Sequence, residues 1–292
     1  MSKSVCVFNL LERLLPISEQ VAVIEPNEMQ RLYRGVGIPS LRTAELAGQA
    51  RFANLHEVKA ANSLLGMVDP IEIHQTYGRL RAAAVDGDPE AMNDLGWLWL
   101  NGARLASNPI LARLLFKLAA VEGGGEAFFN LAEQAFYGKG MVANPVLAID
   151  YYEQAFEYGV PGAALALGAI HEEGDEGVMV DHGRAMLWYK RAVEEGDVLA
   201  GFYRGRLALN ESSTEHDIAS GVYWLQWSAM LGERCASEAL IELYSSPFDS
   251  PPDPELRLYR FWRDFAIEQG SSTAIEMRDA DEATNLRLAE NN

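Results

Sequence analysis

The sequence predicts an all-α protein, a right-handed α-solenoid of antiparallel helix pairs that repeat about every 36 residues. Three observations predict this fold. Segments that begin with alanine recur at a constant interval, apolar residues within them recur at three- and four-residue spacing, and glycine closes every second segment. The chain has 292 residues and is 49% hydrophobic and 10% aromatic, which is enough apolar material for a packed core.

The first helix of each pair is expected at five positions that share one register. These segments begin at Ala91, Ala127, Ala163, Ala200 and Ala236, at intervals of 36, 36, 37 and 36 residues. Their apolar residues follow the spacing of an α-helix, so we expect one face of each helix to be buried.

The second helix of each pair is expected to end at a glycine. The closing glycines are Gly123, Gly159, Gly196 and Gly232, which are 36, 37 and 36 residues apart. Glycine adopts the left-handed conformation that ends many helices without a steric penalty. Gly87 lies 36 residues before the first of them. Residues 74–87 are therefore expected to be the second helix of a partial repeat, whose first helix would cover residues 53–66.

Small residues recur at positions where neighbouring helices must touch. One such column holds Gly96, Ala132, Gly168 and Gly205. A glycine within a helix costs about 1 kcal/mol relative to alanine. Three glycines in one column therefore indicate that another helix approaches closely there.

These repeats resemble the Sel1-like repeat, a longer relative of the tetratricopeptide repeat. The third repeat carries most of that family's pattern, in Ala163, Leu167, Gly168, Gly174, Gly177, Val178, Asp181, Arg184, Ala185, Trp188, Tyr189, Lys190, Ala192 and Gly196. Repeats one and two replace the loop aspartate with Asn108 and Asn144. Repeat four has Arg204, Glu211 and Gly221 where the pattern has leucine, glycine and alanine. Repeat five lacks the glycine of the Leu-Gly pair and has four prolines between positions 247 and 254. The resemblance extends over residues 76–270.

We expect three segments along the chain. Residues 1–50 do not fit the repeat and are expected to form an N-terminal helical cap or arm; alternatively, they fold against the groove or a partner. Residues 51–275 are expected to form the helical-repeat solenoid. Residues 276–292 are polar and acidic and are expected to form a flexible tail.

The first helix of each pair is expected to line a concave groove. The resemblance implies groove positions two before, two after and five after the leucine of each Leu-Gly pair. In this chain they include the candidate partner-binding residues Asn93, Trp97, Phe129, Glu133, Phe136, Glu172, Phe202, Arg206, Glu238 and Glu242, together with Leu100, Leu165, Ala169, Leu209 and Ser245. Aromatic anchors beside charged residues are typical of a protein or peptide site. The alternative is that the N-terminal segment or tighter helix packing covers the aromatics.

No catalytic constellation is recognisable in the sequence. None of the five histidines has a paired-ligand spacing with another histidine or a cysteine, and no Cys-His or Ser-His signature is present. The acidic loop at residues 172–181 lacks the alternating carboxylates of a calcium loop, so a solvated loop is the preferred interpretation. We predict no enzyme, no catalytic residue, no metal and no cofactor. A hydrolase is kept as the disfavoured alternative.

Charge and cysteine usage limit the partners and the compartment. The formal net charge is −18, and residues 211–292 hold 16 acidic and 6 basic side chains. This charge disfavours nucleic acid and favours a basic partner over an acidic one, although it also suits a surface tuned only for solubility. Two cysteines, no signal-peptide pattern and no long apolar stretch lead us to expect a cytoplasmic protein without membrane insertion.

The functional expectation is a scaffold or adaptor that binds a partner protein or peptide in its concave groove. The alternative is a cytosolic immunity protein that neutralises a basic toxin or secreted effector. The sequence leaves the oligomeric state open, with a monomer as the preferred expectation.

Overall fold

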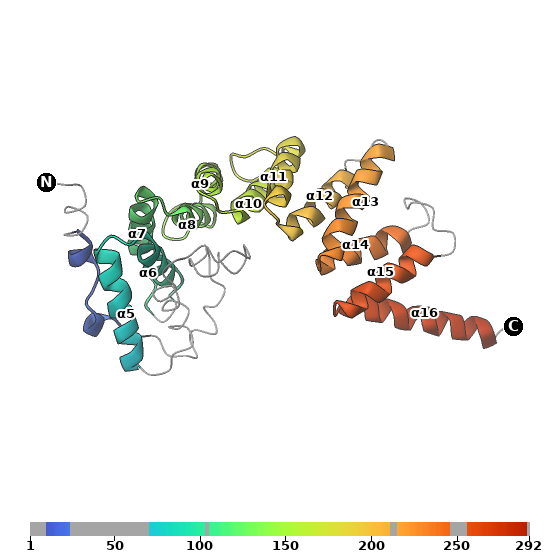
Figure 1. The fold of residues 1–292 in the computed structure, drawn as a ribbon, viewed down its shortest axis with the longest axis horizontal. Coiled ribbons are helices and arrows are strands. Elements are labelled where there is room, and N and C mark those ends of the chain that lie inside the picture. Colours follow the sequence, from blue (N-terminus) through green and yellow to red (C-terminus); the bar gives the residue numbers. More distant parts are fainter. Residues whose placement is uncertain (1–9, 24–69, 103–104, 211–214, 246–255, 291–292) are drawn as a thin grey trace. The chain divides into compact units, whose positions relative to one another are not determined.

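A succession of α-helices makes up the described part of the molecule (Figure 1). The structure is a computed structural model that describes residues 10–23, 70–102, 105–210, 215–245 and 256–290. Its elements are η1 (Ser18–Gln20), α5 (Pro70–Val85), α6 (Pro89–Asn101), α7 (Pro109–Val121), α8 (Gly125–Phe136), α9 (Pro145–Glu157), α10 (Gly162–Glu173), α11 (His182–Glu194), α12 (Val198–Asn210), α13 (Glu215–Met230), α14 (Arg234–Ser245), α15 (Arg257–Glu268) and α16 (Ser272–Glu290). These ranges contain no strand longer than an isolated bridge. The all-α prediction is confirmed.

The helices follow the predicted register. The first helices of the five repeats are α6, α8, α10, α12 and α14, and the second helices are α7, α9, α11, α13 and α15. Helix α5 is the second helix of the partial repeat, whose expected first helix at residues 53–66 lies outside the described residues. The closing glycines Gly87, Gly123, Gly159, Gly196 and Gly232 all have φ between 85° and 101°, which is the left-handed region that favours glycine.

The asparagines that replace the loop aspartate in repeats one and two cap the helices that follow them. The Asn108 side chain accepts a hydrogen bond from the Leu111 backbone N–H at 3.1 Å, and that of Asn144 accepts one from Leu147 at 2.9 Å. In both repeats proline follows the cap at the first helical position, where its missing N–H leaves no bond unmade.

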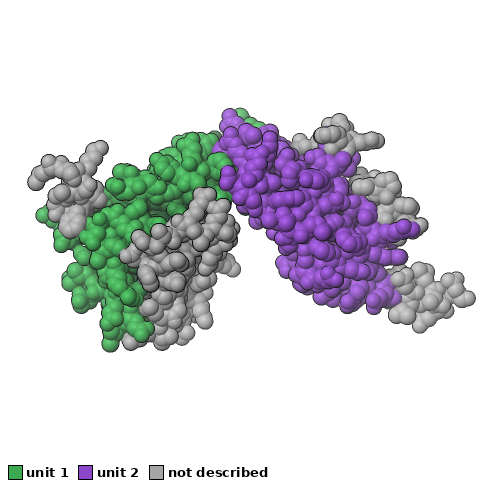
Figure 2. Space-filling view, in the orientation of Figure 1, with its two compact units in different colours: residues 1–181 green, residues 182–292 purple. Residues whose placement is uncertain are grey.

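The chain forms two compact units, Met1–Asp181 and His182–Asn292, which are coloured separately in Figure 2 and described separately below. In the N-terminal unit, residues 10–23 pack against α5. Leu11, Leu15 and Val21 are buried there. Arg81 donates hydrogen bonds to the backbone carbonyls of Leu15 at 3.1 Å and Glu12 at 2.9 Å, and so helps to hold this segment in place.

Close helix approach explains one departure from the family pattern. In the C-terminal unit Gly221 stands on α13 where the pattern has alanine, opposite Gly205 on α12. A β-carbon on Gly221 would lie 2.6 Å from Cγ of Leu209 and 3.0 Å from the carbonyl oxygen of Gly205. An alanine at this position would force Leu209 and the facing backbone of α12 to shift, which favours glycine.

The core of the C-terminal unit includes Leu225, Leu240 and Trp262, and it continues to Ala274 on α16. Helix α16 extends from Ser272 to Glu290, through most of the segment for which we expected a tail. The helix begins after Ser271, which is buried and accepts a hydrogen bond from the Ala274 backbone N–H at 3.1 Å. This serine cap starts the helix despite its polar composition.

Candidate functional site

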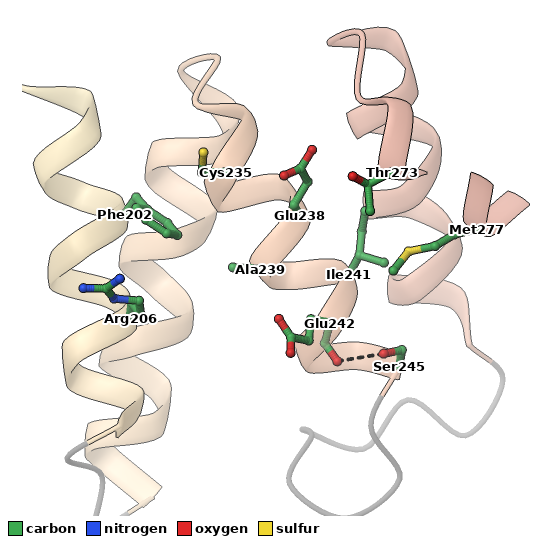
Figure 3. Close-up of a pocket in the computed structure, with 10 residues that line it drawn as sticks. All are labelled: Phe202, Arg206, Cys235, Glu238, Ala239, Ile241, Glu242, Ser245, Thr273 and Met277. Carbon is green, nitrogen blue, oxygen red and sulfur yellow. Dashed lines mark hydrogen bonds between the residues drawn. The ribbon is translucent and has the colours of Figure 1, made fainter. Parts of the chain in front are cut away.

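An open cavity of about 530 Å³ lies among the first helices α12, α14 and α16 of the C-terminal unit (Figure 3). It is lined by Phe202, Arg206, Cys235, Glu238, Ala239, Ile241, Glu242, Ser245, Thr273 and Met277. Four of these are candidate partner-binding residues predicted from the sequence: Phe202, Arg206, Glu238 and Glu242. The structure therefore brings together all the candidates that lie in the C-terminal unit.

The cavity has an apolar base that continues into the core. Phe202, Ala239 and Met277 are partly buried and pack against the hydrophobic cluster of this unit, while Ile241 beside them is buried. These four side chains come from three helices, so the base depends on the packing of consecutive repeats. A ligand group placed there would exchange water for an apolar surface.

One carboxylate of the cavity is already engaged. Glu238 Oε1 accepts a hydrogen bond from the Ser271 hydroxyl at 2.6 Å and lies 3.6 Å from Nε of Arg234, one helical turn earlier. These contacts hold the Glu238 side chain between α14 and the start of α16. Its charge is partly compensated by Arg234 before any ligand arrives.

The other charged groups of the cavity have different surroundings. The guanidinium of Arg206 lies over the ring of Tyr203, on the same helix, at 5.0 Å from the ring centroid. Glu242 is exposed, and it makes no ion pair with any residue in the described part of the chain. The Ser245 hydroxyl donates a hydrogen bond to the backbone carbonyl oxygen of Glu242 at 2.8 Å, and not to the Glu242 carboxylate.

Cys235 is an exposed thiol at the rim of the cavity. Partial desolvation and the nearby Glu233 raise the pKa of Cys235, so the thiol stays protonated at neutral pH. A protonated thiol is a poor nucleophile. The geometry therefore favours a lining role for this residue over a chemical one.

Two candidates in the N-terminal unit do not have the exposure that we expected. Asn93 is 1% exposed and Trp97 is 7% exposed, and Trp97 belongs to the hydrophobic core with Leu100. The Asn130 side-chain amide donates a hydrogen bond to the Asn93 side-chain oxygen at 2.7 Å, which ties α8 to α6. The alternative expectation, that packing covers the groove aromatics, describes Trp97.

The remaining candidates in the N-terminal unit are half-buried. The ring of Phe129 meets that of Tyr152 edge-on at 5.3 Å, and the Tyr152 hydroxyl donates a short hydrogen bond to the Glu133 carboxylate. Burial, reinforced by the Glu133 charge, raises the pKa of Tyr152 far above its ordinary value. Phe136 and Glu172 are partly covered as well. Phe129 and Glu133 thus join α8 to α9, and part of their surface stays accessible.

Sequence reasoning missed five of the residues that line the cavity: Cys235, Ala239, Ile241, Thr273 and Met277. Thr273 and Met277 belong to α16, a further first helix beyond the five repeats that we counted. A signal for this helix was present, because Gly270 has the left-handed conformation of a closing glycine and Ser271 follows it as a cap.

Two other classes of site find no support in the described ranges. No group of three or more histidine, cysteine, aspartate or glutamate residues there is placed to hold a metal ion. Each helix in the same ranges is too short or too polar to cross a bilayer.

The fold and the position of the cavity define a class, the α-solenoid of stacked helix pairs whose first helices carry the binding surface. Within this class, residues 89–123, 126–159 and 161–197 match the Sel1 repeat. The chain thus contains three Sel1 repeats. The resemblance is thereby confirmed for repeats one to three, and the two repeats that depart from the pattern lie outside the match. Sel1 repeats mediate protein–protein interactions, and the fold is typically a non-enzymatic scaffold.

Solved structures of Sel1 repeat proteins share the fold. A Sel1 repeat protein from Oxalobacter formigenes is 24% identical, with a TM-score of 0.63 over 76% of this chain and 88% of its own. The protective antigen c5321 of uropathogenic Escherichia coli is also 24% identical, with a TM-score of 0.59 over 68% of this chain and 42% of its own. An immunity protein from Pseudomonas aeruginosa is 15% identical with a TM-score of 0.44, over 76% of this chain and 89% of its own, which is too distant to bear on function. No curated protein matches the sequence.

Proposed function

We propose that the protein is a cytoplasmic, monomeric scaffold that binds a partner protein through the cavity between α12, α14 and α16. One observation carries the proposal: the four candidate residues Phe202, Arg206, Glu238 and Glu242 share one open cavity. Sel1 repeats mediate protein–protein interactions, and an apolar base rimmed by charged side chains is suited to a protein or peptide partner.

The two cysteines of the chain allow a direct test of this docking site. In a Cys6→Ser background, a benzophenone maleimide on Cys235 places a photo-crosslinker at the cavity rim. Irradiation in the native cytosol should give a discrete adduct. The adduct should be strongly reduced by combined Phe202→Ala and Glu242→Lys substitutions, with folding checked by circular dichroism.

A matched control moves the same probe away from the cavity. Tyr223 on α13 is 56% exposed and does not line the cavity. The variant Cys6→Ser, Cys235→Ser, Tyr223→Cys should not give the adduct. Identical adducts from both positions, an adduct that survives the double substitution, or no adduct at all would each count against the proposed docking site.

A narrower second candidate is an immunity protein that masks a basic toxin or secreted effector. It is favoured by the excess of acidic side chains in residues 211–292 and by the two carboxylates in the cavity. Under this candidate the adduct would contain a basic protein whose toxicity is suppressed by co-expression of the wild-type chain. An adduct with a non-toxic protein would favour the general scaffold.

A further inference from the structure

We infer that the cavity recognises a lysine or arginine side chain next to an aliphatic residue, both presented by a short segment of the partner. The inference rests on the proposed function and specifies the chemistry of the partner. It follows from the contacts that each charged side chain of the cavity makes, from the apolar base and from the size of the cavity.

The carboxylates determine the sign of the ligand charge. Glu238 is engaged by Ser271 and Arg234, whereas Glu242 is exposed and makes no ion pair within the described ranges. Both carboxylates lie on one face of α14, one helical turn apart. A cation that approaches Glu242 is therefore also attracted by Glu238, and an anion is repelled by both.

The single cation of the cavity does not reverse this preference. Arg206 is partly buried, and its guanidinium lies over the Tyr203 ring at 5.0 Å and near the Phe202 ring at 5.8 Å. The Arg206 guanidinium thus already makes cation–π contacts with two aromatic rings of α12. Arg206 stands on α12 against two carboxylates on α14, so the lining has an excess of one negative charge and a basic ligand is favoured.

The apolar base requires a second feature of the ligand. Phe202, Ala239 and Met277 each line the cavity and pack against the core, and Ala239 lies on α14 within one helical turn of Glu242 (Figure 3). Methionine adapts its shape to different aliphatic groups. An aliphatic side chain next to the basic one would cover this surface while the cation meets Glu242, so the preferred segment combines both.

The size of the site favours a short segment. A volume of about 530 Å³ falls within the roughly 300–1,000 Å³ of pockets that enclose small ligands. The excess of acidic residues after position 211 adds attraction at longer range for a basic segment. Binding should therefore weaken as salt is added.

The test uses the full-length chain with 13C-labelled methionine methyl groups and four soluble probes. The Met277 resonance is assigned with Met277→Leu. The probes are the capped hexapeptide Gly-Gly-Lys-Leu-Gly-Gly, its Glu-Leu and Lys-Ser counterparts, and methylammonium, a cation of the same single charge without an aliphatic side chain. The Lys-Leu peptide should shift the Met277 resonance saturably, the Lys-Ser peptide should bind more weakly, and the Glu-Leu peptide should not bind.

Two matched variants connect the effect to the site. Glu242→Gln should weaken binding of the Lys-Leu peptide about two- to fivefold, the effect of one exposed ion pair. Glu268→Gln removes another exposed carboxylate, one that does not line the cavity, and should leave the affinity unchanged. The inference is wrong if the Glu-Leu peptide binds as well as the Lys-Leu peptide, if methylammonium binds as well as the Lys-Leu peptide, or if Glu242→Gln has no effect.

The peptide titration tests the partner chemistry, and the crosslinking test examines the docking site, so failure of one proposal can be told from failure of the other. A specific Cys235 adduct combined with peptides that show no preference for Lys-Leu would overturn the partner chemistry and leave the docking site standing. Loss of both results would remove both proposals.

Discussion

The ring of Phe116 lies against the bare α-carbon of Gly96, where an added β-carbon would come within 2.5 Å of the ring carbon Cε1. Phe116 is fully buried between α6 and α7, so its ring cannot move away. We expect Gly96→Ala to lower the free energy of unfolding by about 1–3 kcal/mol, as overpacked cores do. Urea denaturation followed by circular dichroism measures this loss.

Gly78 provides the control, because it lies within α5 with space around it. A β-carbon there would meet nothing closer than Oγ of Ser18, at 3.8 Å. Gly78→Ala should leave stability unchanged or raise it by up to about 1 kcal/mol, since alanine favours the helix. Equal destabilisation by the two substitutions would show that the space around the glycine is not the deciding factor.

The asparagine caps predict a contrast between two substitutions at one position. Asn144→Ala removes the acceptor for the Leu147 N–H and should cost about 1 kcal/mol. Asn144→Asp keeps the acceptor and adds a negative charge at the helix N-terminus, so it should be neutral or slightly stabilising. Thermal melts of the three proteins at neutral pH test this order, and an aspartate variant as unstable as the alanine variant would contradict it.

Asn93 allows structural and binding roles to be separated. Because Asn93 is buried and accepts a hydrogen bond from Asn130, Asn93→Ala should cost about 1–3 kcal/mol of stability. It should leave the Cys235 photo-adduct unchanged at a temperature where the variant is folded. Loss of the adduct with no loss of stability would return Asn93 to the set of partner-binding residues.

Glu126 predicts a pH-dependent effect. Burial raises the pKa of Glu126 above its ordinary value, so the folded chain holds this proton at a pH where the unfolded chain has released it. Stability is therefore lost as the pH rises from the ordinary glutamate pKa through the raised one. Glu126→Gln should raise the melting temperature at pH 8 relative to wild type and have little effect at pH 4. An equal gain at both pH values would exclude ionisation as the cause.

Much of the fold could be predicted because its determinants lie within single repeats. The closing glycines and the small-residue column reflect local backbone and packing requirements, which the sequence displays directly. The start of α16 was missed because a polar helix has little amphipathic pattern. The local signals for it were the closing Gly270, the cap Ser271 and Ala274, the buried residue among positions 272–283.

The candidate site could be predicted only in part, for a physical reason. Spacing determines which face of a helix a residue occupies, but it does not determine what else packs on that face. Trp97 and Arg206 occupy equivalent register positions, each two residues after the leucine position of its first helix. The former is part of a core and the latter lines an open cavity, and this difference depends on contacts between elements far apart in sequence.

The close approach of Gly205 and Gly221 limits how this chain could be engineered. Repeat proteins are often stabilised by replacing unusual residues with the commonest residue of the family. Here the family's alanine at position 221 would collide with Leu209 and with the backbone of the facing helix. Replacing Gly221 alone with the family's alanine should therefore destabilise the fourth repeat. A smaller residue at position 209 would relieve the closest contact, and a slightly wider separation of α12 and α13 would relieve the contact with the backbone.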